Sequence, residues 1–479
     1  MKNVLITHSY FLHFDPKQLR LSKPYPPLAT LLLASVIRNN GYRLAFYDTQ
    51  FDTSVEGLKS KLKTEKPDIF IVADDGFNYL TKMCLTNMRE AAMEMLKEAK
   101  NTHHCFCIVS SSDATDHAEK YLAAGADVVI AGEAEETLTE LLLCIEKNES
   151  WKTLPGIIYN ENGAVGKTEK RPVMKNLDNL PLPAWDVLDF SPYKNAWKKQ
   201  GYFSVNLATT RGCPFKCNWC AKPIYGNRYN VRSAKCVVDE IKYIRQFTRF
   251  EHIWFCDDIF GLKPGWMEEF SAEVKKENVK IKYKIQSRAD LLQDESTIRS
   301  LAESGCDEVW IGAESGSQKI LDAMDKGITL AEIERAVRWL KQYHIKPCLF
   351  IQFGYLGEEK EDIERTLDMI EKLQPYDIGV SVSYPLPGTL FYEKVKGQLK
   401  NKTNWSDSDE LAVMYSAEFN PEFYKTLHRF VHKRFRFIQG KQFLKGKKEF
   451  KRQGLLLPWF YFSSLAYKNR MKKFRSNRQ

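Results

Sequence analysis

The chain has 479 residues, of which 43% are hydrophobic and 28% charged, with a net charge of +10 and 11 cysteines. This length and composition predict an ordinary globular protein of about three domains with a sizeable core. The N-terminus shows no secretory signal, and no apolar run reaches the roughly 20 residues of a membrane-spanning helix. We therefore expect a cytoplasmic protein with reduced thiols rather than a secreted disulfide framework.

The N-terminal part, residues 1–150, alternates short apolar runs of strand length with stretches of helical periodicity. Such alternation predicts a doubly wound, Rossmann-like parallel sheet, whose ligands sit beyond the carboxyl ends of the strands. The expected strands are Asn3–Thr7, Arg43–Tyr47, Asp68–Ala73, Cys105–Val109 and Ala126–Ala131, and the expected helices are Leu28–Asn39, Met83–Lys100 and Glu136–Lys147.

A loop with three thiols follows a Pro-rich linker at residues 151–195 and the strand-like run Ser204–Thr210. Cys213, Cys217 and Cys220 stand in C-x3-C-x2-C spacing. The neighbouring Gly and Pro residues keep the segment out of regular structure, so the thiols can curl round one point. Soft thiolates on a compact loop suit an iron–sulfur cluster or zinc.

The number of ligands favours the cluster over zinc. A structural zinc site has four protein ligands. The nearest candidates for a fourth ligand, Cys236 and His252, lie farther along the sequence than the usual short spacing between zinc ligands. Three thiolates on a four-iron cluster leave one iron open to a small molecule, which is a catalytic arrangement. Zinc and unligated core cysteines remain the alternatives.

The C-x3-C-x2-C spacing with Trp219 just before the last cysteine resembles the radical S-adenosylmethionine (SAM) enzymes. In that family the open iron chelates the amino and carboxylate groups of SAM, and one-electron reduction releases a 5′-deoxyadenosyl radical. The resemblance implies that Cys213, Cys217 and Cys220 bind a [4Fe–4S] cluster. It also implies a reductant such as flavodoxin or ferredoxin.

Strands and helices alternate again after the cysteine loop. Counting the strand before the loop there are six such units, too few to close an eight-fold barrel, so we expect an open (β/α)6 partial barrel like that of the radical SAM family. Barrel chemistry sits at the carboxyl ends of the strands. The further strands are expected at His252–Cys256, Ile281–Gln286, Glu308–Ile311, Pro347–Phe353 and Asp377–Tyr384, and the helices at Cys236–Phe247, Trp266–Asn278, Glu295–Ser304, Leu330–His344 and Lys360–Leu373.

Polar residues end several of these strands. Asp257 and Asp258 either cap the following loop or accept hydrogen bonds from the SAM amino group, as the matching position does in relatives. Arg288 either donates two hydrogen bonds to the SAM carboxylate or forms an ion pair with Asp290. No catalytic side chain is assigned. The resemblance implies SAM contacts from Trp219, Asp257, Asp258, Arg288, Glu314, Ser315, Gln352 and Tyr355.

The N-terminal part resembles the cobalamin-binding domain that often precedes a radical SAM barrel. The resemblance rests on Pro26-Pro27-Leu28, Asp48 and the stretch Gly132–Thr137. No D-x-H-x-x-G motif is present, so cobalamin would be bound without that lower axial histidine, and Ser110–Ser112 stands where relatives carry a Gly-Gly pair. The alternative is a Rossmann-like domain that binds nothing. The implied cobalamin contacts are Asp48, Ser111, Thr115, Gly132 and Glu133.

The C-terminal extension, residues 396–479, carries the basicity of the chain. Residues 421–479 hold 17 Lys and Arg against two acids, whereas the remainder of the chain has a charge of −5. Phe430–Arg452 interleaves Lys and Arg with Phe at roughly helical spacing. Such a segment is a helical cap on the barrel, a peripheral membrane contact or an RNA-binding surface, and the pattern favours RNA least.

The sequence thus predicts an α/β enzyme with a Rossmann-like domain at 1–150, a linker at 151–195, a radical SAM partial barrel at 196–395 and a basic helical extension. It resembles the cobalamin-dependent group that includes anaerobic magnesium-protoporphyrin monomethyl ester cyclases and methylases of unactivated carbon. The resemblance implies methylation or oxidative cyclisation of a small or lipid-like substrate. An RNA-modifying radical SAM enzyme and a non-catalytic cobalamin or cluster carrier are the alternatives.

Overall fold

The computed structural model describes residues 2–74, 76, 85–222, 224–399 and 404–474. The chain divides into two compact units. The first unit comprises residues 1–214, 222–282 and 404–410, and the second comprises residues 215–221, 283–403 and 411–479. The chain therefore passes between the units at both ends of residues 215–221, after residue 282, and at both ends of residues 404–410.

The first unit contains a seven-stranded sheet in the order β2-β1-β3-β4-β5-β6-β7, of which β1 to β5 pair in parallel. Its inner strand β3 is buried at every position, as expected for a parallel strand covered on both faces. The predicted doubly wound fold is confirmed. The strands are β1 (Asn3–Thr7), β2 (Arg43–Tyr47), β3 (Ile69–Ala73), β4 (Phe106–Ser110), β5 (Val128–Ile130), β6 (Ile157–Glu161) and β7 (Ala164–Lys167).

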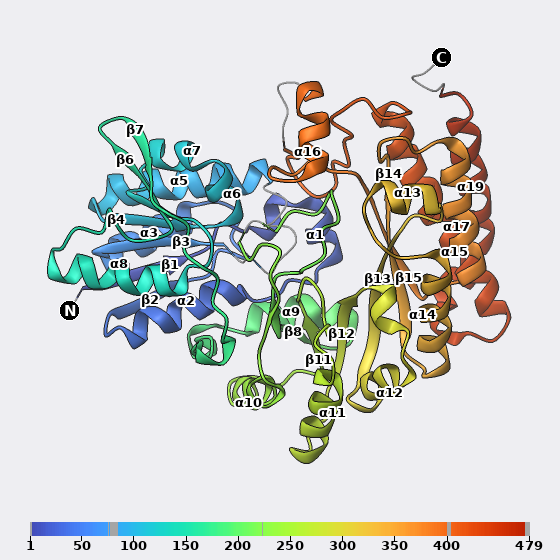
Figure 1. Cartoon of the computed structure of the whole chain (residues 1–479), viewed down its shortest axis with the longest axis horizontal. Coiled ribbons are helices and arrows are strands. Elements are labelled where there is room, and N and C mark those ends of the chain that lie inside the picture. The colour runs from blue at the N-terminus through green and yellow to red at the C-terminus, as the bar shows by residue number, and fades with distance from the viewer. Residues whose placement is uncertain (1, 75, 77–84, 223, 400–403, 475–479) are drawn as a thin grey trace. The chain divides into compact units, whose positions relative to one another are not determined.

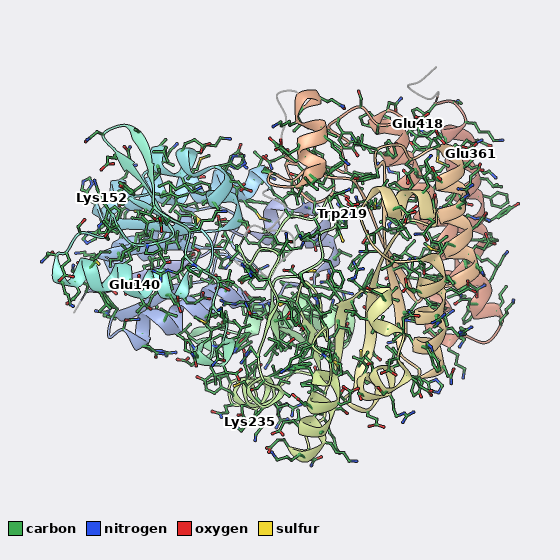
Figure 2. The ribbon with its side chains drawn as sticks, viewed as in Figure 1. Glu140, Lys152, Trp219, Lys235, Glu361 and Glu418 are labelled. Carbon is green, nitrogen blue, oxygen red and sulfur yellow. The ribbon has the colours of Figure 1, made fainter. Side chains whose placement is uncertain are left out.

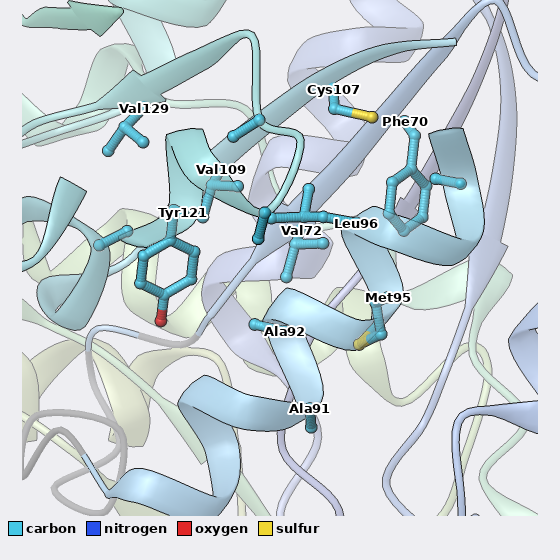
Figure 3. Packing of buried hydrophobic residues seen from close by; sticks show 14 of the residues in the cluster. Phe70, Val72, Ala91, Ala92, Met95, Leu96, Cys107, Val109, Tyr121 and Val129 are labelled. Carbon is cyan, nitrogen blue, oxygen red and sulfur yellow. The ribbon is translucent and has the colours of Figure 1, made fainter. Parts of the chain in front are cut away.

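Helices cover both faces of this sheet (Figure 1). On one face α3, α5 and α7 pack on Phe70, Val72 and Val109, and Figure 3 shows this cluster with Tyr121 at its edge. On the other face α2 and α8 pack on the alternate side chains of the same strands. The helices are α2 (Leu28–Asn39), α3 (Glu56–Glu65), α5 (Thr86–His103), α6 (Ser112–Asp116), α7 (Ala118–Ala123) and α8 (Glu135–Lys147); the expected start of α5, Met83, lies outside the described residues.

The hairpin β6–β7 extends the sheet beyond β5. Strand β6 pairs antiparallel with β5 and with β7. These residues fall in the segment that the sequence assigned to the linker. The rest of that segment is irregular apart from short helical turns and α9 (Ser191–Trp197).

All six strands predicted for the partial barrel are present. In the first unit β8 pairs in parallel with β11, and in the second unit β12, β13, β14 and β15 form parallel neighbours in that order. Their bounds are β8 (Ser204–Leu207), β11 (His252–Phe255), β12 (Lys282–Ser287), β13 (Cys306–Glu314), β14 (Lys346–Phe353) and β15 (Asp377–Val382). The intervening helices are α10 (Ala234–Ile244), α11 (Trp266–Lys276), α12 (Glu295–Glu303), α13 (Gln318–Ala323), α14 (Leu330–Gln342), α15 (Lys360–Leu373) and α16 (Leu390–Val395).

The C-terminal extension is helical, as predicted. In the second unit α17 (Pro421–Leu444) and α19 (Leu457–Met471) pack side by side and are joined by α18 (Lys451–Leu455) (Figure 1). The segment 404–410 instead returns to the first unit, where the Trp405 carbonyl accepts a hydrogen bond from Thr86 N (2.9 Å). Among the described helices, none has the length and apolar character needed to cross a bilayer.

Candidate active site

The cysteine loop begins at a glycine whose conformation excludes other residues. Gly212 has φ +79°, and a Cβ at this position would overlap the Arg228 carbonyl oxygen. Two residues earlier the short strand β9 (Thr210–Arg211) pairs antiparallel with β10 (Asn230–Val231). The hairpin and the glycine together turn the chain sharply into the loop. Cys213, Cys217 and Cys220 are reduced and half-buried.

Arg211 ties the start of the loop to the turn between β5 and α8. Its Nη2 lies 2.5 Å from Glu135 Oε1 and its Nη1 lies 3.3 Å from Glu133 Oε1. Met174 N donates a second hydrogen bond to Glu133 (2.5 Å). Burial alone would lower the pKa of Arg211, but Glu135, Tyr225 and Glu133 together outweigh it and raise that pKa. Glu133, a predicted cobalamin contact, is thus already engaged within the protein.

Asp257 holds the end of strand β8. Its carboxylate accepts hydrogen bonds from Thr209 N (2.7 Å), Thr209 Oγ1 (2.6 Å) and Thr210 N (2.8 Å). Burial raises the pKa of Asp257 to about 6. Asp257 thus holds the segment that leads into the cysteine loop, and the half-buried Asp258 is the more accessible of the pair. A SAM contact from either residue stays a prediction.

Arg288, at the end of β12, lies against the cysteine loop. Its guanidinium stacks over the Phe215 ring at 3.6 Å, and its Nη1 is 3.8 Å from Cys217 Sγ. The predicted pairing with Asp290 is also present, with Nε–Oδ1 at 2.9 Å. The Arg288 guanidinium thus places a fixed positive charge beside the loop cysteine Cys217.

Glu314 and Lys326 form a buried ion pair near Trp219. Lys326 Nζ lies 2.8 Å from Glu314 Oε1 and 6.0 Å from the centre of the Trp219 ring. Glu314 adopts φ +58°, a left-handed conformation that aims its side chain away from the regular strand path. The sequence analysis missed Lys326. The turn Asp325-Lys326-Gly327 gave no sign that its lysine would be buried.

Tyr355 contacts the middle of the cysteine loop. Its hydroxyl donates to Asn218 Oδ1 (2.6 Å), while Asn218 Nδ2 donates to the Ala323 carbonyl (2.7 Å) and to Asp325 (2.9 Å). Burial raises the pKa of Tyr355 to about 12, so the hydroxyl remains a donor at neutral pH. The sequence analysis assigned Tyr355 to SAM but missed Asn218, whose place between Cys217 and Trp219 is its one signal.

The two remaining predicted SAM residues have partners within the second unit. Gln352 Nε2 donates to Ser383 Oγ (2.8 Å), and Ser315 Oγ lies 3.2 Å from Thr366 Oγ1. Both residues therefore fix the strand ends of the barrel. Whether they also touch SAM stays a prediction.

Comparison with known proteins assigns this loop to a family. The sequence model of the radical SAM superfamily matches residues 207–370, a segment that contains all three loop cysteines and Arg288. Residues 207–370 thus match a radical SAM domain.

Relatives by sequence include methyltransferases and cyclases. An uncharacterised methyltransferase of Pyrococcus horikoshii is 28% identical over 385 residues, covering 79% of this chain and 81% of that protein. The anaerobic magnesium-protoporphyrin IX monomethyl ester cyclase of Cereibacter sphaeroides is 25% identical, covering 78% of this chain and 61% of the cyclase. The chain thus spans less than two thirds of the cyclase.

Solved radical SAM structures share the fold along most of the chain. The cobalamin-dependent enzyme OxsB, with aqua-cobalamin bound, has a TM-score of 0.74 at 18% identity and covers 98% of this chain and 72% of its own. The methyltransferase TsrM of Kitasatospora setae, with cobalamin and a [4Fe–4S] cluster bound, has a TM-score of 0.68 at 17% identity, covering 83% of this chain and 75% of its own. These matches confirm the predicted α/β fold class.

The residues around the radical SAM loop fit the cluster and SAM. Trp219, labelled in Figure 2, has an indole N–H that is buried with no hydrogen-bond partner among the described residues. A buried donor without a partner is costly, which points to a polar ligand beside the loop. The cations Arg288 and Lys326 supply positive charge next to Cys217, as an anionic carboxylate or cluster requires. In the described part of the chain, no three His, Cys, Asp or Glu side chains, the loop cysteines included, are gathered as a metal-binding group.

The carboxyl edge of the Rossmann-like sheet also carries buried polar atoms without partners. Gln50 Nε2, after β2, and Ser112 Oγ, after β4, are buried and have no partner among the described residues. Strand ends of this kind are where such sheets bind ligands. A ligand rich in amide and phosphate groups, such as cobalamin, fits these atoms. Ser112 lies in the predicted Ser110–Ser112 stretch but was not predicted as a contact, and Gln50 was not predicted, although its position soon after β2 was a signal.

Most of the predicted cobalamin residues already form hydrogen bonds within the first unit, and Gly132 borders open space. Asp48 accepts from Tyr193 OH (2.7 Å) and pairs with His8 Nε2 (2.9 Å). Ser111 caps helix α6 by accepting from Ala114 N (2.9 Å), and Thr115 donates to the Ser111 carbonyl (2.9 Å). Gly132 has φ +93° and open space where a Cβ would stand. Their contact with cobalamin stays a prediction.

Proposed function

We propose that this radical SAM enzyme uses cobalamin to methylate or oxidatively cyclise an unactivated carbon of a small or lipid-like biosynthetic intermediate. The observation that carries the proposal is the loop of Cys213, Cys217 and Cys220, with Arg288 and the unpartnered Trp219 donor at its second and third cysteines. The cobalamin part is supported by the Rossmann-like sheet and by the cofactor bound in the structurally similar OxsB and TsrM.

Cys213, Cys217 and Cys220 would hold a [4Fe–4S] cluster. When bound, that group would supply the electron for cleavage of SAM at its sulfur–C5′ bond, which gives methionine and a 5′-deoxyadenosyl radical able to take hydrogen from the substrate. Arg288 places its positive charge beside Cys217 and would offer that cation to the SAM carboxylate. Asn218 and Tyr355 fix the loop so that the thiols keep their spacing. Glu314 would accept hydrogen bonds from the ribose hydroxyls.

The reductant would be a low-potential one-electron carrier of the flavodoxin or ferredoxin type. We place the reaction in the cytoplasm, with a lipid-like substrate favouring a position at the membrane surface. Cobalamin would supply a methyl group to carbon or assist the oxidation.

Iron and cobalt content and SAM cleavage test the proposal together. Protein purified without oxygen from cobalamin-fed cells should hold about four irons and about one cobalt per chain. It should release 5′-deoxyadenosine when reduced with SAM present. Cys217→Ala should lose both iron and cleavage, whereas Cys144→Ala, at a half-buried cysteine on α8, should keep both.

The cobalamin and cluster assignments can each be refuted separately. Iron with SAM cleavage but no cobalt, even after cobalamin is added, would refute the cobalamin part and leave the radical chemistry. Retained cleavage in Cys217→Ala would refute the cluster assignment itself.

A further inference from the structure

The inner face of helix α17 is anchored to the barrel part of the second unit. Phe430, Val431 and Phe435 are buried. Arg434 pairs with Glu371 on α15 (2.5 Å), and Gln439 Nε2 donates to the Tyr376 carbonyl (2.8 Å). Part of the basic, aromatic segment is therefore a helical cap, as one of the predicted alternatives has it.

Helix α19 packs on the outer side of α17 and leaves its own outer face uncovered. A Cβ on Gly440 would meet Leu457 at 2.6 Å, so the two helices approach closely at this glycine. Lys433 Nζ lies 3.6 Å from the Trp459 ring. In contrast, Phe462 is 67% exposed and Trp459 is 53% exposed.

The most exposed large apolar side chains of the described residues all lie in one short stretch. Leu444, Leu455 and Phe462 are 67–69% exposed, and Leu456 and Trp459 lie between them in the sequence and are also exposed. Leu455 ends α18, and Trp459 and Phe462 lie three residues apart on α19, a spacing that places these two on one side of that helix. Such a cluster of exposed apolar groups marks an interaction site.

Positive charges flank these side chains. Lysines and arginines are exposed throughout the stretch 441–473, against the single acid Glu449. Among the described residues, no ion pair engages any of these cations. We define the C-terminal patch as exposed apolar residues Leu444, Leu455, Leu456, Trp459 and Phe462 with the exposed bases Lys445, Lys447, Lys448, Lys451 and Arg452.

We infer that the C-terminal patch docks on an anionic lipid surface. Exposed Leu and Phe side chains can enter the boundary between head groups and acyl chains, and lysines around them attract anionic lipid head groups. Trp459 has the amphipathic ring that is typical of this boundary. The docking does not depend on the proposed chemistry, because the patch lies outside the cysteine loop.

Two other partners fit the patch less well. RNA is held through phosphates and base stacking, and the aliphatic Leu444, Leu455 and Leu456 cannot stack on bases. A second copy of the chain would bring two patches of the same positive charge together, which is unfavourable.

Vesicle sedimentation with the full chain tests the inference. Binding to vesicles of equal phosphatidylcholine and phosphatidylglycerol should be at least about tenfold tighter than to phosphatidylcholine alone. It should weaken as NaCl rises from about 0.05 M to about 0.5 M, because salt screens the lysines. Binding that is absent, or equal for both lipids, would overturn the proposal.

Paired variants identify the surface. Leu455→Ser with Phe462→Ser should weaken binding to the mixed vesicles by about tenfold or more. Leu390→Ser, at a 63% exposed apolar residue outside the C-terminal patch, should not. Lys447→Gln with Lys448→Gln should weaken binding, whereas the same charge loss at exposed Lys198 and Lys199 should not. Equal effects of patch and control variants would refute the assignment.

Two further measurements separate the other partners. Salt-sensitive binding of single-stranded RNA that the patch variants lose, without vesicle binding, would assign the surface to RNA. A concentration-dependent dimer in sedimentation velocity that Phe462→Ser abolishes, again without vesicle binding, would assign it to a second copy. Circular dichroism spectra and 5′-deoxyadenosine formation should be unchanged in all these variants, which shows that each remains folded.

Discussion

Arg211 and Glu135 form a buried ion pair, with Nη2 and Oε1 2.5 Å apart, although 76 residues separate them in the sequence. Arg211 begins the cysteine loop and Glu135 begins helix α8 of the Rossmann-like sheet. Within the first unit, the pair therefore joins the residue that leads into the loop to the sheet edge where cobalamin is proposed to bind. Glu133 joins the same guanidinium at 3.3 Å.

Replacing Arg211 should destabilise the fold strongly. Arg211→Met leaves the carboxylates of Glu133 and Glu135 buried without their cation, which should cost about 3–5 kcal/mol of unfolding free energy. Urea unfolding followed by circular dichroism measures this. The exposed pair Arg20–Asp409 provides the control, since Arg20→Met should cost less than about 1 kcal/mol. Equal losses would show that burial of the Arg211 pair has no energetic consequence.

Gly212 should be irreplaceable for cluster binding. In Gly212→Ala the new Cβ overlaps the Arg228 carbonyl oxygen at φ +79°, so the loop entry must move and iron content should fall. Gly201→Ala is the control, because it has a similar φ of +78° but nothing within 4 Å of the new Cβ. The control should lose only about 1–2 kcal/mol of stability and keep its iron. Full iron content in Gly212→Ala would contradict the packing argument.

Glu314 should contribute to SAM binding beyond its pairing with Lys326. Glu314→Gln can still accept a hydrogen bond from Lys326 Nζ, so the chain should fold and bind iron. Loss of the charge should weaken SAM binding by about tenfold, the usual scale for one charged hydrogen bond. Equilibrium dialysis with SAM measures the Kd. Exposed Glu303→Gln is the control, and an unchanged Kd for Glu314→Gln would remove Glu314 from the SAM site.

Glu358 should make stability depend on pH. Burial raises its pKa from 4.5 to about 8, and Gly354 N donates to its carboxylate (2.5 Å). Because the folded-state pKa lies above the unfolded one, the stability Glu358 contributes is fully present below pH 4.5 and is lost as the pH rises through 8.

The neutral variant Glu358→Gln isolates this effect. Between about pH 5 and about pH 8, the wild-type unfolding free energy should fall relative to that of the variant by up to about 1.4 kcal/mol per pH unit. Glu361→Gln, on the outer surface of α15 (Figure 2), is the control and should track the wild type. Parallel pH profiles for wild type and Glu358→Gln would contradict the raised pKa.

Local patterns determined the elements of this protein. The helical stretches Leu28–Asn39 and Lys360–Leu373 predicted α2 and α15 with their observed bounds; α15 buries one face, whereas α2 is buried at nearly every position. Continuous apolar runs likewise predicted the parallel strands. The spacing of Cys213, Cys217 and Cys220 indicated the family, since three thiols within eight residues can meet on one loop without any distant contact.

Only the tertiary structure decided which strand-end polar residues remain accessible to a ligand. The sequence placed Glu133, Asp257 and Glu314 at strand ends but could not show that their charges are taken by Arg211, Thr209 and Lys326. A buried carboxylate pairs with the donor that the fold brings close to it. Strand order and the paths of the turns determine which donor that is, and the local sequence period does not encode either of them. The sequence therefore determined the chemistry of the loop, while tertiary packing decided which of its neighbours hold the scaffold and which are left to meet a ligand.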